Sequence, residues 1–185
     1  MIPVLESERL ILRGWREADF EPFAAIYASQ DEARYIGGVH TRDDAWRRMA
    51  SYIGHWVLRG YGHWVLEDKA SGAFAGWSGL WSPEGFPGRE VSWTLTPEMR
   101  GRGLAQEAAR RVRAFAYETL GWDSVISLIN VDNEPSIRVA ERLGATFESV
   151  VLFRGSDCAI YRHPSARSLS STQTPVNRKE KAECP

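Results

Sequence analysis

The sequence predicts one mixed α/β (α+β) domain, in which helices lie on the faces of a central sheet. Strand-like segments dominate the middle of the chain, and helical segments interrupt them. Residues 90–143 alternate strand, helix, strand and helix. The 185 residues, 43% hydrophobic and 25% charged, can form a single core without disulfides or metal.

The N-terminal part is expected to contain one strand and two helices. Residues 10–12 form the strand, and Asp19 begins a short helix with apolar side chains at helical spacing. Thr41, followed by Asp44, resembles a capping pair for a second helix that ends before Gly60. The apolar stripe predicted for this second helix consists of Trp46, Met49, Ala50, Ile53 and Val57.

The middle of the chain changes to strand-like segments. Residues 63–67 and 74–77 are expected to be strands joined by a polar turn. Residues 82–88 contain two prolines and two glycines and form a loop. Residues 90–95 form a further strand, which breaks at Pro97.

The second half continues the alternation of helix and strand. A long amphipathic helix follows Gly103, and residues 124–129 form a largely apolar strand of the kind found at the centre of a sheet. Asn133 caps the next helix, which Gly144 stops.

The last two strands, residues 147–153 and 157–162, complete a domain over residues 1–163. From Pro164 onward, Ser, Thr, Pro, Lys and Glu replace most apolar residues. This composition predicts a disordered tail over residues 164–185. Truncation after Pro164 is therefore expected to leave thermal stability nearly unchanged.

Composition excludes several classes of protein. With 23 basic and 24 acidic residues, the chain has no basic excess that would indicate nucleic-acid binding. No segment approaches the roughly 18 apolar residues of a membrane span, and the charged N-terminus does not resemble a signal peptide. The two cysteines, Cys158 and Cys184, are too few for a disulfide scaffold and favour a cytoplasmic location.

Residues 100–105, Arg-Gly-Arg-Gly-Leu-Ala, form a candidate phosphate site between a strand and a helix. The N–H groups of a helix start bind anions, and Gly101 and Gly103 let a ligand approach the backbone closely. Arg100 and Arg102 could add charged donors. The alternative is a surface turn with solvated arginines. The chain has no P-loop motif, and Gln106 occupies the place of the third glycine of a dinucleotide-binding fingerprint.

Three motifs together resemble the GNAT acetyltransferase superfamily. Arg100-x-x-Gly103-x-Ala105 resembles its acyl-CoA pyrophosphate loop. Residues 133–144 resemble its second signature, N-x-x-S-x-x-x-x-x-x-x-G. Residues 7–13, with Trp15 and Asp19, resemble the N-terminal strand of the branch that contains the ribosomal-protein N-terminal acetyltransferases. The resemblance spans residues 7–162.

The resemblance implies a mostly antiparallel sheet of about seven strands with helices on both faces. Two parallel strands, residues 90–96 and 124–130, would splay apart and admit the pantetheine arm of acetyl-CoA. Asn133 is either a coenzyme contact or only a helix cap. The coenzyme-binding residues implied are Leu95, Thr96, Arg100, Gly101, Arg102, Gly103, Leu104, Ala105 and Asn133.

Two residues are implied in the chemistry. Glu90 would act as general base, directly or through water, or else is a carboxylate at the strand edge paired with Arg89 or another cation. If Glu90 is the base, Glu90→Gln is expected to lower kcat chiefly at low pH, where the amine is protonated. Many family members place a Tyr where this chain has Ala140. Ser136 could instead donate a proton to the departing thiolate, or it is only a residue of the first helical turn.

These residues predict an acetyl-CoA-dependent N-acetyltransferase that acts on a primary amine, of a protein N-terminus or a small molecule, in a ternary complex. A non-catalytic acyl-CoA-binding sensor or interaction domain is the alternative. Cys158 is expected to be a buried structural thiol, and no spacing supports a metal site. The chain would be a monomer or a homodimer.

The acceptor pocket is expected to draw on residues of two loops and a strand end. The eight tryptophans are either core fillers or walls of an aromatic substrate slot. The residues predicted for the pocket are Tyr35, Ile36, Trp81 and Phe86.

Overall fold

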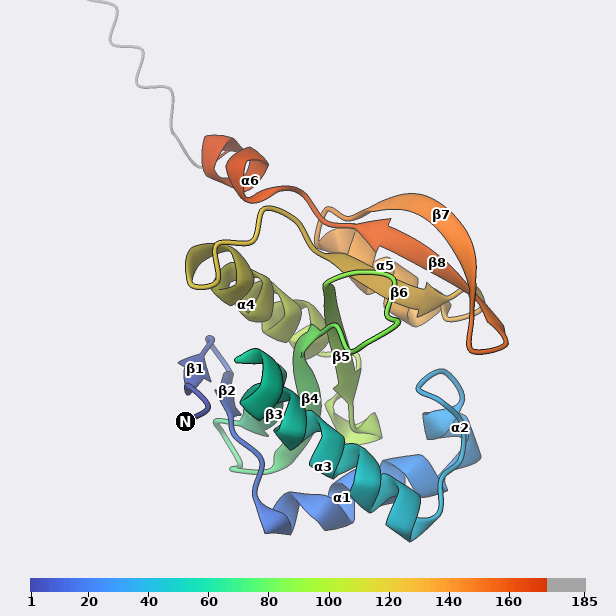
Figure 1. Cartoon of the computed structure of the whole chain (residues 1–185). Coiled ribbons are helices and arrows are strands. Elements are labelled where there is room, and N and C mark those ends of the chain that lie inside the picture. Colours follow the sequence, from blue (N-terminus) through green and yellow to red (C-terminus); the bar gives the residue numbers. More distant parts are fainter. Residues whose placement is uncertain (173–185) are drawn as a thin grey trace, which may run out of the picture.

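A computed structural model describes residues 1–172, which form one eight-stranded sheet in the order β1-β2-β3-β4-β5-β6-β8-β7 (Figure 1). Its neighbours are antiparallel except for the parallel pair β5–β6. The strand added to the predicted seven is a two-residue edge strand. The strands are β1 (Leu5–Glu6), β2 (Leu10–Arg13), β3 (His63–Asp68), β4 (Phe74–Trp81), β5 (Glu90–Leu95), β6 (Ile126–Asn130), β7 (Thr146–Phe153) and β8 (Ser156–Arg162).

The helices follow the predicted order, with two additions, α2 and α6. The Thr41 hydroxyl accepts a hydrogen bond from the Asp44 N–H, and Gly60 ends that helix at φ 75°, as the sequence predicted. None of the helices in residues 1–172 is long and apolar enough to cross a bilayer. The helices are α1 (Phe20–Ala28), α2 (Gln30–Ala33), α3 (Arg42–Arg59), α4 (Leu104–Glu118), α5 (Glu134–Arg142) and α6 (Ala166–Thr172).

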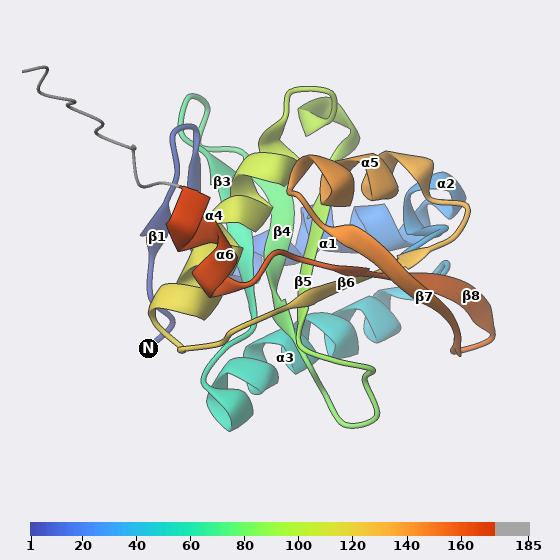
Figure 2. The same cartoon turned by 90° about the horizontal axis from the view of Figure 1, so that it is seen from above.

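Helices cover both faces of the sheet. On one face, α4 packs Leu104, Ala108 and Val112 against β2–β5. On the opposite face, α1 and α3 form an aromatic cluster with Trp77 of β4. Figure 2 shows α3 and α4 on opposite sides of β3, β4 and β5. Burial of apolar area on both faces is the main contribution to the stability of such a layered domain.

The buried face of α3 differs from the predicted stripe. Trp46, Ile53 and Val57 are exposed, by 49%, 37% and 82%. The buried positions are instead Ala45, Met49, Tyr52, His55 and Trp56. The helix turns this face to the sheet because its side chains pack against the rings there: the Tyr52 and His63 ring centroids lie 4.3 Å apart.

The start of the expected disordered tail is ordered in the described residues. The Tyr117 hydroxyl donates to the Pro164 carbonyl, and the Ala166 N–H donates to the Asp123 carbonyl. These bonds attach α6 beside the C-terminal end of α4. The remainder of the predicted tail, residues 173–185, lies outside the described residues.

The parallel pair β5–β6 is in register at one position, Glu90 opposite Ile126. Beyond it the Ser127 hydroxyl donates to the Val91 carbonyl at 2.6 Å and lies 3.0 Å from His163 Nε2. Arg113 donates to His163 Nδ1 at 3.2 Å. Burial, with the nearby Arg113 charge, lowers the pKa of His163 to about 3, so the ring is neutral. This buried network lies where the predicted splay of the two strands begins.

Candidate active site

Two cavities meet where β5 and β6 diverge. The larger cavity, of about 550 Å³, lies between the sheet and helices α1 and α3. The loop cavity, of about 450 Å³, lies between β5 and the N-terminal ends of α4 and α5. They are adjacent, since both are lined by Tyr35, Ile36, Trp93, Thr94, Asn133 and Ser136.

The wall of the loop cavity includes the turn that opens α4. Gly101 and Gly103 have φ angles of 72° and 77°, a region that residues with a side chain rarely adopt. Gly103 is the N-cap of α4 and has no capping side chain. The first N–H groups of a helix have no intrahelical partner. The N–H groups of Leu104, Ala105 and Gln106 therefore have no helical partner along this cavity, as the predicted phosphate site requires.

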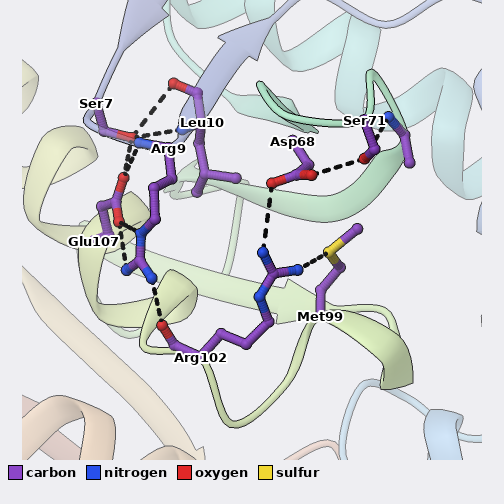
Figure 3. Close-up of polar contacts among 9 residues, drawn as sticks. Ser7, Arg9, Leu10, Asp68, Ser71, Met99, Arg102 and Glu107 are labelled. Atoms are coloured by element: carbon purple, nitrogen blue, oxygen red, sulfur yellow. Dashed lines mark hydrogen bonds and ion pairs between the residues drawn. The ribbon is translucent and has the colours of Figure 1, made fainter.

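The two arginines of the turn have different positions. Arg100 lines the loop cavity, pairs with Glu32 and donates to the Leu95 carbonyl at 3.2 Å. Arg102 lines neither cavity. Its guanidinium lies 3.1 Å from Met99 Sδ and 3.9 Å from an Asp68 carboxylate oxygen (Figure 3). The structure therefore brings Arg100, and not Arg102, to the predicted phosphate site.

The turn is braced from the N-terminal strand. The Glu107 carboxylate accepts hydrogen bonds from the Ser7 hydroxyl and from the backbone and guanidinium of Arg9, each at 2.7 Å (Figure 3). Arg9 also donates to the Arg102 carbonyl at 2.8 Å. Burial acts to raise the pKa of Glu107, but the bonds from Arg9 and Ser7 outweigh it and hold that pKa below its ordinary value.

Glu107→Gln should lower the melting temperature by roughly 4–8 °C at pH 7, because it removes charged hydrogen bonds worth about 1.5–3 kcal/mol. A carboxyl with a lowered pKa stabilises the fold above its unfolded pKa and loses this effect as pH falls. The difference from wild type should therefore shrink below the ordinary Glu pKa of 4.5. Thermal melts at pH 7 and pH 4 measure it, with exposed Glu118→Gln as control. Equal shifts for both variants at pH 7 would contradict the bracing role.

Alternate residues of β5 direct their backbone N–H and C=O groups into the gap that opens between β5 and β6. The Thr96 N–H donates to the Ala75 carbonyl, at the end of the antiparallel β4–β5 ladder. Because antiparallel bonding alternates, the N–H and C=O groups of Trp93 and Leu95 point to the other side, toward β6. Thr96 lines neither cavity and its N–H is occupied, so the gap presents Trp93 and Leu95 in place of the predicted Leu95 and Thr96.

Glu90 is buried at the narrow end of the gap and lines the larger cavity. One carboxylate oxygen accepts a hydrogen bond from the Leu128 N–H at 3.1 Å. Burial raises the pKa of Glu90 to about 8, against the opposing effect of this bond. The Arg89 guanidinium stacks on the Trp122 ring at 4.6 Å and makes no ion pair with Glu90, so the predicted alternative of a strand-edge carboxylate paired with Arg89 is wrong.

Asn133 and Ser136 lie at the junction of the two cavities. The Asn133 side-chain oxygen accepts from the Ser136 N–H at 3.3 Å, which confirms the predicted helix cap. Within residues 1–172, no hydrogen bond joins the Ser136 hydroxyl to another residue. This hydroxyl is available to a bound molecule.

The residues predicted for the acceptor pocket come together. Tyr35, Ile36, Trp81 and Phe86 all line the larger cavity. The Tyr35 hydroxyl donates to the Asp132 carbonyl at 3.1 Å, which ties the loop after α2 to the loop after β6.

The sequence reasoning missed several residues of the larger cavity: Tyr27, Arg48, Tyr52, His63, Trp77 and Ser92. His63 Nε2 lies 2.7 Å from the Ser92 hydroxyl, and burial lowers the pKa of His63 to about 3. On α1 and α3 the missed side chains resemble an ordinary core stripe. Only the period-two alternation of Glu90, Ser92 and Thr94 could have indicated that Ser92 shares a face with Glu90.

Cys158 also lines the larger cavity, where burial and then the nearby Glu90 raise the pKa of its thiol. A thiol with a raised pKa is mostly protonated and is a poor nucleophile. Within the described part of the chain, no three His, Cys, Asp or Glu side chains gather as metal ligands.

Known proteins resemble this chain in sequence and fold. A family model for the acetyltransferase (GNAT) domain matches residues 9–146. An acetyltransferase from Agrobacterium tumefaciens is 31% identical, with a TM-score of 0.81 over 88% of this chain and 95% of that chain. A chain from Bordetella pertussis, described as a GnaT-family acetyltransferase, is 32% identical, with a TM-score of 0.76 over 88% and 99%.

A third structure shares the fold at low identity. RimL, a ribosomal L7/L12 alpha-N-protein acetyltransferase in complex with coenzyme A, is 16% identical, with a TM-score of 0.72 over 88% of this chain and 98% of that chain. Since the family model covers most of the sheet and both motif-bearing helices, this chain belongs to the GNAT acetyltransferase family and is an acetyltransferase.

Proposed function

We propose that this protein transfers the acetyl group of acetyl-CoA directly to a primary amine, with both substrates bound at once. The observation that carries the proposal is the junction of the two cavities, where the Ser136 hydroxyl has no hydrogen bond to any residue in 1–172. One cavity would hold the coenzyme and the other a small amine. Acetyl-CoA supplies an activated thioester, and the protein supplies position, a base and a proton donor.

The loop cavity fits the coenzyme. The start of α4 and the glycines at 101 and 103 would hold the pyrophosphate, and Arg100, which is paired with Glu32, would add a hydrogen-bond donor. Trp93 and Leu95 would bond the pantetheine amides along the open edge of β5, much as another strand would. Asn133 would contact the coenzyme while it caps α5.

The larger cavity would hold the acceptor amine, with Glu90 as the base that removes its proton, directly or through water. A carboxyl with a pKa of about 8 is well matched to an amine that must lose a proton near neutral pH. The raised pKa of the Cys158 thiol argues against an acyl-enzyme on this residue. Tyr35, Ile36, Trp81 and Phe86 would form walls around the acceptor.

Ser136→Ala should lower kcat by roughly 10- to 100-fold while the dissociation constant of coenzyme A changes less than about twofold. A hydroxyl that donates to the departing sulfur acts mainly in the transition state, so its loss affects rate more than affinity. Steady-state kinetics and calorimetric titration measure the two quantities. Ser136→Thr, which keeps the hydroxyl, should restore most of the rate. Loss of affinity in step with kcat would contradict the assignment.

Two-substrate kinetics test direct transfer. Intersecting double-reciprocal lines are expected for a ternary complex. Parallel lines, together with an acetylated protein mass that Cys158→Ser abolishes, would show a covalent intermediate instead. Coenzyme binding without transfer to any amine of a broad panel would favour a non-catalytic acyl-CoA-binding domain.

A further inference from the structure

The larger cavity is rich in positive charge. Among residues 1–172, its lining includes Arg34, Arg48 and Arg154 and a single acidic residue, Glu90. Within residues 1–172, none of these three arginines has a carboxylate within 4 Å. The chain as a whole has a net charge of −1, so the excess of positive charge in this lining is local.

Arg48 is the most firmly placed of the three. This half-buried residue of α3 donates to the Ile36 carbonyl at 3.2 Å and lies 3.5 Å from the Tyr27 hydroxyl. Its guanidinium lies 5.1 Å from the centre of the Tyr27 ring. A Cβ atom at Gly37 would come within 2.8 Å of Arg48 Nη2, so the loop backbone closes over it. The carbonyl, hydroxyl, ring and loop backbone that contact Arg48 are all uncharged.

A half-buried guanidinium surrounded by neutral groups is a strong site for an anion. Desolvation strengthens its attraction to a carboxylate, and its planar donors match the two carboxylate oxygens. Arg47, the preceding residue on α3, shows the opposite case: it is exposed and pairs with Asp43 and Asp44. Arg48 is therefore the cation of this helix that remains available to a ligand in the cavity.

We infer that the acceptor is a small amine that also bears a carboxylate, as an amino acid does, and that Arg48 binds this carboxylate while the amine faces Glu90. The inference rests on the proposed function and narrows its acceptor class. The cavity volume of about 550 Å³ is that of a small-molecule site. Tyr27, Tyr52 and Trp77 provide aromatic walls for an apolar side chain. A polyamine, which is wholly cationic, suits this charge pattern least.

The test compares acceptors that differ only in the carboxylate. Phenylalanine and methionine are each measured against the corresponding decarboxylated amine, with acetyl-CoA at saturation. The wild-type enzyme should prefer the carboxylate-bearing member of each pair by roughly 10- to 100-fold in kcat/KM. In Arg48→Gln this preference should fall to within about threefold of unity. The amines differ in basicity, but this difference cancels when the preference ratios of the two enzymes are compared.

Three further measurements test whether the acceptor preference depends on Arg48. Arg47→Gln, the adjacent exposed variant, should keep the wild-type preference. Arg48→Lys, which keeps the charge without the planar fork, should retain part of it. The coenzyme A affinity and the melting temperature of each variant show whether its fold is intact. If Arg48→Gln does not fold, the acceptor preferences of the wild-type enzyme and of Arg48→Lys still test the inference.

The outcomes separate this inference from the proposed function. Acetyl transfer with equal or better use of the decarboxylated amines would overturn the inference and leave the proposed function standing. A preference that persists unchanged in Arg48→Gln would also overturn it. Faster transfer to an acidic peptide with a blocked C-terminus than to either amino acid would overturn the small-molecule class. Absence of transfer to any acceptor would instead contradict the proposed function.

Discussion

Gly103→Val should raise the dissociation constant of coenzyme A by at least about 100-fold, whereas Arg102→Ala should change it less than about threefold. Gly103 is the N-cap of α4 at φ 77°, where a β-branched residue is strained. The strain would displace the N–H groups that are expected to hold the pyrophosphate. Arg102 lies outside the loop cavity, against Met99 and Asp68, and contributes little to that site.

Gly121→Val is a matched control for backbone strain. Gly121 has φ 66°, no atom lies within 4 Å of the Cβ it would gain, and it lines neither cavity. This variant should lose stability but keep its affinity for coenzyme A. Calorimetric titration of the three variants measures the affinities. Equal, small losses for Gly103→Val and Arg102→Ala would show that the turn does not bind the coenzyme.

Glu90→Gln should lower kcat/KM by roughly 10²- to 10⁴-fold at pH 9 and far less at pH 6. Burial raises the pKa of Glu90 to about 8, so at pH 6 the wild-type carboxyl is itself protonated and cannot accept a proton. This reverses the expectation from the sequence that the loss is greatest at low pH. That expectation assumed a carboxyl with an ordinary pKa.

The ratio of wild-type to variant kcat/KM, measured from pH 6 to 9.5 with one acceptor, isolates this effect. Protonation of the amine affects both enzymes equally and cancels from the ratio. Glu84→Gln is the control, because Glu84 is fully exposed beside Arg59 and lines neither cavity. A ratio that does not change with pH would mean that Glu90 does not act as a titrating base.

The same substitution should stabilise the protein at alkaline pH. The pKa of Glu90 is higher in the folded protein, about 8, than in the unfolded chain, 4.5. The contribution of this carboxyl to the stability of the fold is therefore fully present below pH 4.5 and is lost as the pH rises through about 8. Each pH unit between the two pKa values is worth about 1.4 kcal/mol. At pH 9 the melting temperature of Glu90→Gln should exceed that of wild type by roughly 10–20 °C, and near pH 5 the two should be similar.

Local chemistry alone determined much of the framework of this protein. Thr41, Gly60 and Asn133 mark helix ends in the sequence and do so in the structure. The strand at residues 90–95 and the glycine turn after it were both predictable, because strand period, capping and positive φ depend on residues a few positions apart. Each of the three family motifs is likewise a short run of residues, so the family could be recognised from the sequence.

The tertiary structure decided which side chains the framework brings to the site. Neighbours from distant strands buried Tyr52 and left Trp46 and Val57 of the same helix exposed. The ladder with β4 occupied the Thr96 N–H, and the position of the turn directed Arg102 away from the loop cavity. No local pattern could indicate these outcomes, since each depends on segments far apart in the chain.

Electrostatics depended most strongly on the assembled fold. Glu90 has a pKa of about 8 because the packed sheet and helices remove water from it, and Arg48 faces a cavity because α3 crosses the sheet there. The sequence alone determined the elements and the glycine turn that opens α4. The tertiary structure decided solvation and pairing of the charged groups, because both depend on atoms that come together only when the chain folds.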